Sequence, residues 1–106
     1  MAKSVVRGIT RMLMNDFNFD GGIIFKSPTS DGYFTVQARH LQPNETAILD
    51  GKEYTNNCND YIPYVQLFYN DCTIKKFHFS RPQKYIKLIN EEVKNKNLTV
   101  EEIIQP

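Results

Sequence analysis

Residues 33–41 carry the clearest alternation of hydrophobic and polar positions in the chain. In the sequence YFTVQARHL, every second residue from Phe34 to Ala38 is apolar, and the residues between them are polar. A period of two places alternate side chains on opposite faces of a strand. The pattern therefore predicts a strand with one face in the core and the other in water.

Dipeptides that favour tight turns divide the rest of the chain. Asp-Gly occurs at Asp20-Gly21, Asp31-Gly32 and Asp50-Gly51, and Asn70-Asp71 separates two apolar runs. Asp-Gly suits type I′ turns because both central residues need positive φ, and Asn and Asp tolerate that region. Consecutive turns of this kind connect antiparallel neighbours in a meander. They predict strands over residues 14–19, 22–27, 33–41, 45–49, 52–56, 62–69 and 72–79.

The apolar runs on either side of the fourth turn predict a hairpin over residues 62–79. A two-residue turn would pair Leu67 with Ile74 and Tyr64 with Phe77. Both faces of this hairpin would then be largely apolar. We expect it at the centre of the sheet, covered on both sides, or with one face against a partner.

Apolar residues at helical spacing predict a helix near each end of the chain. A short N-terminal helix follows Ser4, where Val5 and Ile9 recur on one face. The C-terminal helix is expected to begin after Ser80 as the N-cap, with Gln83 completing a capping box.

The last segment, TVEEIIQP, predicts a further turn or two of helix, because Thr99 and Glu102 form a second capping box. Together the elements predict a single α+β domain over residues 1–106. We expect an antiparallel β-meander of five to seven strands, packed by the C-terminal helix and the short N-terminal helix. A partly closed barrel is the alternative to an open sheet, because many short strands leave edges that need covering.

Composition is that of an ordinary globular domain. The 106 residues are 41% hydrophobic and 24% charged, and the net charge of +1 gives no global field toward nucleic acid or membrane. Cys58 and Cys72 have no zinc-like spacing. The chain has no apolar signal-peptide core and no run of about 20 apolar residues, so we expect a cytoplasmic protein with free thiols and no membrane partner.

Local charge is concentrated in residues 75–87, KKFHFSRPQKYIK, which carry five Lys or Arg and no acid. Basic groups interleaved with Phe77, Phe79 and Tyr85 suit phosphate contact and base stacking. Alternatively, the aromatic residues belong to the core and the lysines form a solvated sheet edge. The candidates for binding phosphate or another ligand are Lys75, Lys76, His78, Arg81 and Lys84.

Residues 42–74 are acidic, with five Asp or Glu against one Lys. The segment YTNNCNDYIPY combines Asn with Tyr, as adaptable recognition loops do. The alternative is a plain polar loop between hairpins. The candidates for contact with a protein partner are Glu45, Asp50, Glu53, Tyr54, Asp60, Tyr61 and Tyr64.

Signals for metal or catalytic chemistry are weak. Residues 16–21, DFNFDG, match the first positions of a calcium loop, but position 12 is Ser27 in place of the bidentate Glu. A hairpin about Asp20-Gly21, which would pair Phe19 with Gly22, explains the spacing better. We therefore predict no metal site. Hydrolase, zinc and phosphate-loop motifs are missing, so we expect no enzyme and no cofactor, although distant side chains could still converge.

These observations favour a small non-enzymatic binding protein that acts by occupying a macromolecular partner, most simply a protein. A regulator or inhibitor of bacterial, phage or mobile-element origin suits the size, and ten Asn and ten Ile are typical of an AT-rich genome. One alternative is a module that binds single-stranded nucleic acid or a nucleotide through residues 75–87. Another is a structural subunit of a phage or other assembly, with stable oligomers built on an exposed hairpin edge.

Overall fold

The computed structural model describes residues 21–104. The predicted N-terminal helix, the strand over residues 14–19 and the calcium-like spacing before Gly21 lie outside this part of the chain. The described residues form seven strands and one helix: β1 (Gly22–Lys26), β2 (Tyr33–Leu41), β3 (Thr46–Leu49), β4 (Lys52–Thr55), β5 (Ile62–Phe68), β6 (Ile74–His78), α2 (Pro82–Asn95) and β7 (Thr99–Ile104).

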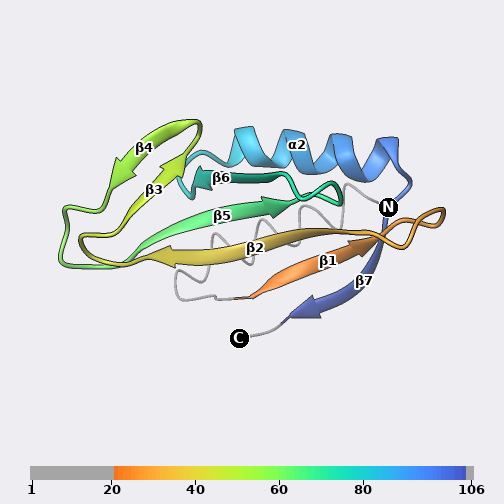
Figure 1. Cartoon of the computed structure of the whole chain (residues 1–106), viewed down its shortest axis with the longest axis horizontal. Helices are drawn as coiled ribbons and strands as arrows, with labels where there is room; N and C mark the ends of the chain where they lie inside the picture. Colours follow the sequence, from red (N-terminus) through yellow and green to blue (C-terminus); the bar gives the residue numbers. More distant parts are fainter. Residues whose placement is uncertain (1–20, 105–106) are drawn as a thin grey trace.

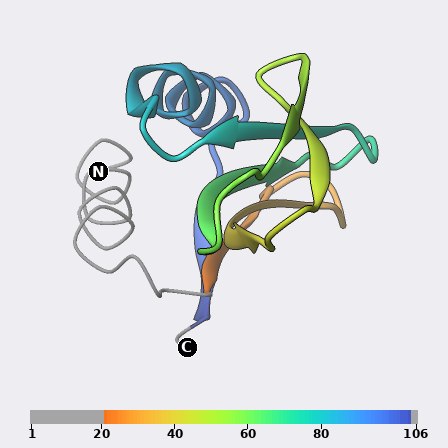
Figure 2. The same ribbon diagram turned by 90° about the vertical axis from the view of Figure 1, so that its left-hand side faces the viewer.

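Five of the strands form one antiparallel sheet in the order β6-β5-β2-β1-β7, and β3 pairs with β4 in a separate hairpin (Figure 1). The α+β class and the antiparallel arrangement are confirmed. The sheet is open, so the partly closed barrel is wrong for the described residues. Figure 2 shows α2 and the β3–β4 hairpin on different sides of the sheet.

The core lies between α2 and one face of the sheet. The alternation in β2 is confirmed, because Phe34, Val36 and Ala38 are all buried. Burial of a large apolar side chain contributes roughly 1.5–3 kcal/mol each. From the helix, an apolar stripe faces them, and burial raises the pKa of the Tyr85 phenol in this stripe to about 12. The buried side chains of α2 are Tyr85, Ile89 and Val93.

The register of the β5–β6 hairpin differs from the prediction by one residue. Val65 pairs with Phe77, and Leu67 pairs with Lys75. The loop has three residues in place of two, because the Tyr69 N–H donates to the Thr73 carbonyl at 2.8 Å. A shift of one residue exchanges the faces of a strand. Phe77 therefore lies in the core, while Ile74 and Lys76 lie on the opposite face.

The position of this hairpin in the sheet also differs from the prediction. β5 is internal, whereas β6 is an edge strand. The hairpin is covered by α2 on one face, and on the other face Phe68 and Ile74 are exposed. We call the face that α2 leaves uncovered the outer face of the sheet.

The predicted Asp-Gly turn at Asp31-Gly32 is not a tight hairpin turn. β1 is bonded to β2 on one edge and to β7 on the other. The predicted hairpin about Asp20-Gly21, with its pairing of Phe19 and Gly22, lies outside the described residues. Asp31-Gly32 lies in a six-residue loop between Lys26 and Tyr33.

The third Asp-Gly turn is confirmed. Asp50 and Gly51 have φ of 56° and 77°. Leu49 pairs directly with Lys52 across them, as in a type I′ turn.

The helix start differs in detail from the prediction. Its N-cap is Arg81 and Pro82 is its first residue, with no side-chain cap. The Ser80 hydroxyl instead lies 2.7 Å from Nδ1 of His78. The predicted capping box at Ser80 is therefore wrong.

The C-terminal end of α2 reverses the direction of the chain before the last strand. Asn97 has φ of 51°, and the Leu98 N–H donates to the Val93 carbonyl at 3.0 Å, which makes a Schellman motif. The chain then reverses beside β1 and forms β7, so the predicted helical turn at Thr99 is wrong. β-Branched residues suit the open edge of β1, and Glu101 is accommodated as a bulge.

Substitution of Gly22 by Ala is expected to lower the free energy of unfolding by about 1–3 kcal/mol, because the new methyl group would meet the Val36 carbonyl of the neighbouring strand. Gly32→Ala is the matched control. The atoms nearest to its methyl group belong to the side chain of Asn70, which can move. Urea denaturation of both variants checks this, and equal losses of stability would contradict it.

Candidate functional site

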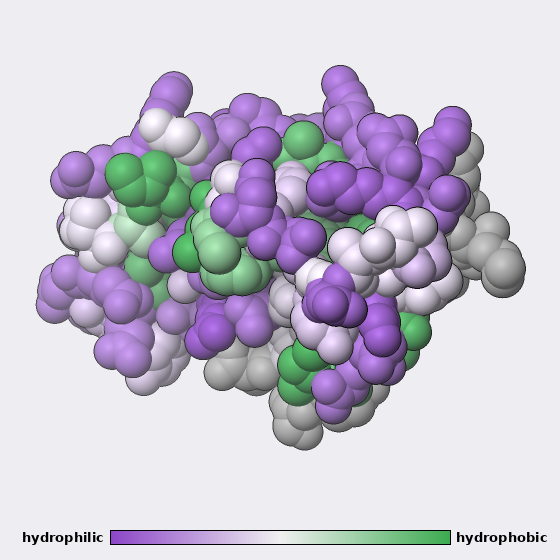
Figure 3. All heavy atoms as spheres, turned by 45° about the vertical axis from the view of Figure 1, so that its right-hand side comes forward, coloured by the Kyte–Doolittle hydropathy of each residue, from purple (hydrophilic) through white to green (hydrophobic). Residues whose placement is uncertain are grey.

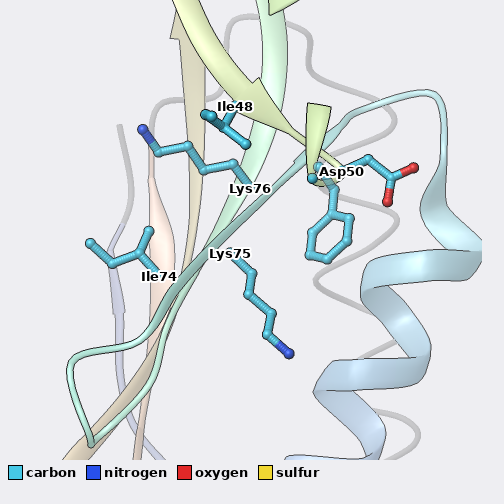
Figure 4. A pocket seen from close by; sticks show the side chains of 7 residues that line it. Ile48, Asp50, Ile74, Lys75 and Lys76 are labelled. Carbon is cyan, nitrogen blue, oxygen red and sulfur yellow. The ribbon is translucent and has the colours of Figure 1, made fainter. Parts of the chain in front are cut away.

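A groove of about 420 Å³ runs between the β3–β4 turn and the edge strand β6 (Figure 4). The turn brings an exposed isoleucine and a carboxylate to the groove, and β6 brings two lysines. The lining residues are Ile48, Asp50, Gly51, Ile74, Lys75, Lys76 and Phe77.

Asp50 holds the turn against the sheet by two interactions. Its backbone N–H donates to the Lys76 carbonyl at 2.7 Å, and its Oδ2 lies 2.6 Å from Nζ of Lys84 in α2. The hydrogen bond from Lys84 lowers the pKa of the Asp50 carboxyl, and the charges of Lys84, Arg81 and Lys52 act in the same direction. The Asp50 carboxylate is thus neutralised within the chain.

The strand β6 divides the groove into two sides, because successive side chains point in opposite directions. In Figure 4, Lys76 extends beside Ile48, whereas Lys75 extends to the other side of the strand. Nζ of Lys76 lies 5.7 Å from the centre of the Tyr64 ring. On the other side, Nζ of Lys75 lies 5.3 Å from the centre of the Tyr69 ring.

The apolar part of the groove continues across the outer face as a row of large exposed side chains, which we call the outer strip. Ile74 pairs with Phe68, which pairs with Thr35 on β2, two positions from Tyr33. Such direct and diagonal neighbours share one face. The strip consists of Ile48, Ile74, Phe68 and Tyr33, which are 59%, 50%, 37% and 44% exposed.

On the molecular surface, hydrophobic residues lie among hydrophilic ones (Figure 3). Figure 3 shows one face of the molecule, where they gather in separate patches between polar side chains. The outer strip joins elements that are far apart in the sequence, namely β2, β3, β5 and β6.

The basic candidates are only partly brought together. Lys75 and Lys76 line the groove, Lys84 is paired with Asp50, and Arg81 is the N-cap of α2. His78 lies on the outer face, with its ring 5.9 Å from that of Tyr54.

Two of the three aromatic residues of the basic segment are buried. Phe77 and Tyr85 are buried, and Phe79 packs against the core. Phe77 and Tyr85 are therefore core residues, and these two rings have no exposed face for base stacking. Stacking needs an exposed ring face.

The acidic candidates divide between the groove and the rest of the surface. Asp50 lies in the groove, Tyr64 lies under Lys76, and Tyr54 contacts His78. Glu53 is exposed and pairs with Ile48 across the β3–β4 hairpin.

The remaining acidic candidates lie outside the groove. The Glu45 carboxylate accepts the Gln42 N–H at 3.0 Å, and the Asp60 carbonyl is bonded within its own loop. Tyr61 is exposed outside the groove. The structure therefore joins parts of the acidic and the basic segments into one site.

One residue of the polar loop has a structural role that the sequence did not reveal. Asn56 is fully buried, and its side-chain amide donates to the carbonyls of Leu41 and Asp60 at 3.0 and 2.7 Å. Its Oδ1 accepts the Cys58 N–H at 2.9 Å, an Asx turn. The segment contains three Asn and one Asp within five residues, so the pattern alone could not single out Asn56.

Within residues 21–104, no group of three His, Cys, Asp or Glu side chains could hold a metal ion. In the same range, no helix has the length and hydropathy needed to cross a membrane. The chain matches no known family model, no curated protein and no solved structure. The function is therefore argued from the geometry of the site.

Replacement of Lys84 by Met is expected to raise the pKa of Asp50 toward its ordinary value of 3.8, because the largest cause of its depression is removed. A depressed carboxyl pKa stabilises the fold above the unfolded value, and this contribution disappears as pH falls through the folded value. Carboxyl-carbon NMR titration checks this. Lys87→Met, an exposed position on the same helix, is the control, and an unchanged Asp50 titration in Lys84→Met would contradict the assignment.

Replacement of Asn56 by Ala is expected to lower the free energy of unfolding by about 2–4 kcal/mol, since it leaves three backbone groups without their partner. Its exposed neighbour provides the control, and Asn57→Ala is expected to change stability by less than about 0.5 kcal/mol. Thermal and urea unfolding measure both variants. Similar small effects would show that Asn56 does not hold this loop.

Proposed function

We propose that the chain is a small protein-binding module, a regulator or inhibitor that acts by occupying its partner through the outer strip. One observation carries the proposal: four large side chains, those of Ile48, Ile74, Phe68 and Tyr33, lie exposed on neighbouring strands, three of them on the face that α2 leaves uncovered. Contiguous apolar surface rimmed by polar residues is typical of protein interfaces.

The charges beside the outer strip indicate the character of the partner. Lys75 and Lys76 border its groove end, while the nearby Asp50 is already paired with Lys84. The local field of the site is therefore positive. We propose a partner surface with an apolar centre and acidic residues at its rim.

The side chains proposed to contact the partner differ from those expected from the sequence. The sequence predicted that residues of the acidic segment 42–74, among them Glu45 and Asp50, contact a protein partner. The carboxylates of Asp50, Glu45 and Asp71 instead make contacts within the chain. Because these contacts compete with an outside partner, the exposed apolar row is the better candidate for the binding surface.

The alternative of nucleic-acid or nucleotide binding through residues 75–87 has weaker support. Phe77 and Tyr85 are in the core, so these two rings are not exposed for stacking, and Lys84 is paired with Asp50.

A photo-crosslinking amino acid at Tyr33, introduced in cells of the organism that encodes the chain, is expected to capture one defined protein. The purified protein should then bind the wild-type chain and bind Phe68→Ser at least about tenfold more weakly, because an anchor at the centre of the strip is lost. Calorimetry measures the affinities.

The control for this experiment is Ile103→Ser, which removes a comparably exposed apolar side chain from β7 at the far edge of the sheet. Its affinity should equal that of the wild type. Equal affinities for wild type and Phe68→Ser, or a crosslink to nucleic acid alone, would contradict the proposed function.

A further inference from the structure

The backbone of β6 presents hydrogen-bonding groups away from its own sheet. In a β-strand the N–H and C=O of one residue point to the same side, and successive residues alternate. The Lys76 carbonyl accepts the Asp50 N–H from outside the sheet, so the peptide groups of Lys76 and Ile74 face away from β5.

The β3–β4 turn occupies only part of this edge. Between Ile74 and Lys76, the backbone hydrogen bond from the turn is the one from the Asp50 N–H to the Lys76 carbonyl, and Ile48 and Gly51 line the groove beside it. The N–H and C=O of Ile74 and the N–H of Lys76 have no strand beside them among residues 21–104. They lie along the groove of about 420 Å³ described above.

The side chains along this edge suit an extended ligand. On the outer side, Ile48 and Ile74 offer apolar contact next to the ammonium group of Lys76 (Figure 4). On the other side, Lys75 offers a second positive charge. An added strand would place alternate side chains on these two sides, so a segment that mixes apolar and acidic residues matches both.

We infer that the β6 edge binds an extended acidic and apolar segment of the partner protein as an additional β-strand. This inference rests on the proposed function and specifies how the partner reaches the outer strip. Backbone bonds to Ile74 and Lys76 supply the pairing, and the two lysines supply selectivity for acidic side chains.

Charge argues against pairing of β6 with β6 of a second copy. Such an antiparallel pair would place the lysines of the two chains against each other, and like charges across a ladder are destabilising. Edge lysines protect sheets from self-association for the same reason. Pairing with β7 of a second copy, which carries Glu101 and Glu102, is an outcome that the experiment distinguishes.

The first test uses short blocked peptides that alternate Glu or Asp with Ile or Val, and matched peptides with Lys in place of the acids. The acidic peptides are expected to bind the wild-type chain about tenfold more tightly than the Lys peptides. On binding, the amides of Ile74 and Lys76 should become protected from hydrogen exchange. Unprotected amides in the complex would overturn strand addition.

Two variants at Ile74 separate backbone from side-chain contributions. Ile74→Ser and Ile74→Pro both lose the apolar side chain, but only Pro lacks the N–H, which faces away from β5. Pro is tolerated at such edge positions. Ile74→Pro is expected to bind the acidic peptide at least about tenfold more weakly than Ile74→Ser. Equal affinities would overturn the inference.

Charge reversal keeps the inference testable if Ile74→Pro does not fold. The double variant Lys75→Glu and Lys76→Glu is expected to prefer the Lys peptides. The inference is overturned if this double variant still prefers the acidic peptides. It is also overturned if a single-stranded oligonucleotide binds more tightly at the same amides, or if light scattering gives a molar mass above that of one chain.

The affinities of these variants for the crosslinked partner test the strand addition separately from the proposed function. If Phe68→Ser weakens its binding while Ile74→Pro and Ile74→Ser bind equally, the strand addition fails and the proposed function stands. If all of these variants retain wild-type affinity, both fail.

Discussion

The packing of α2 against one face of a five-stranded sheet is the constraint on which the rest of this structure depends. Tyr85, Ile89 and Val93 cover the alternating apolar positions of the central strands, and one helix of this length can cover only one face. Because β2 and β5 alternate, their other side chains must lie on the opposite face. The Schellman motif at Asn97 then turns the chain toward β1 and lets β7 close the far side of the sheet.

The length of the loop between β5 and β6 decides which side chains of β6 lie on the outer face, where the candidate binding surface is. Its third residue moves Phe77 into the core and leaves Ile74 and Lys76 on the outer face. With the two-residue turn expected from the sequence, Phe77 would have been outside and the edge would have had a different chemistry. A single residue of loop length therefore decides both which aromatic ring completes the core and which groups line the groove.

Asp50 links the two charged segments that the sequence presents as separate surfaces. Its type I′ turn carries the acidic hairpin over the edge of β6, and its carboxylate meets Lys84 of the basic segment. An exposed ion pair of this kind contributes little to stability. Its consequence is chiefly geometric and electrostatic, because it holds the turn beside β6, so that Ile48 and Ile74 line one groove, and leaves Lys75 and Lys76 there without an acidic partner among residues 21–104.

Local patterns in the sequence were sufficient for the six predicted strands from residue 22 to residue 79, the antiparallel pairing and the C-terminal helix, because alternation, Asp-Gly turns and helical spacing act over a few residues. Local patterns gave the wrong element where the conformation of a segment depends on a strand that is distant in the sequence. Thr99 to Ile104 has both a capping box and β-branched residues, and the open edge of β1 selected the strand. The outer strip and the groove combine residues of four strands, so the tertiary structure alone decided them: local propensity cannot determine which distant side chains share a face.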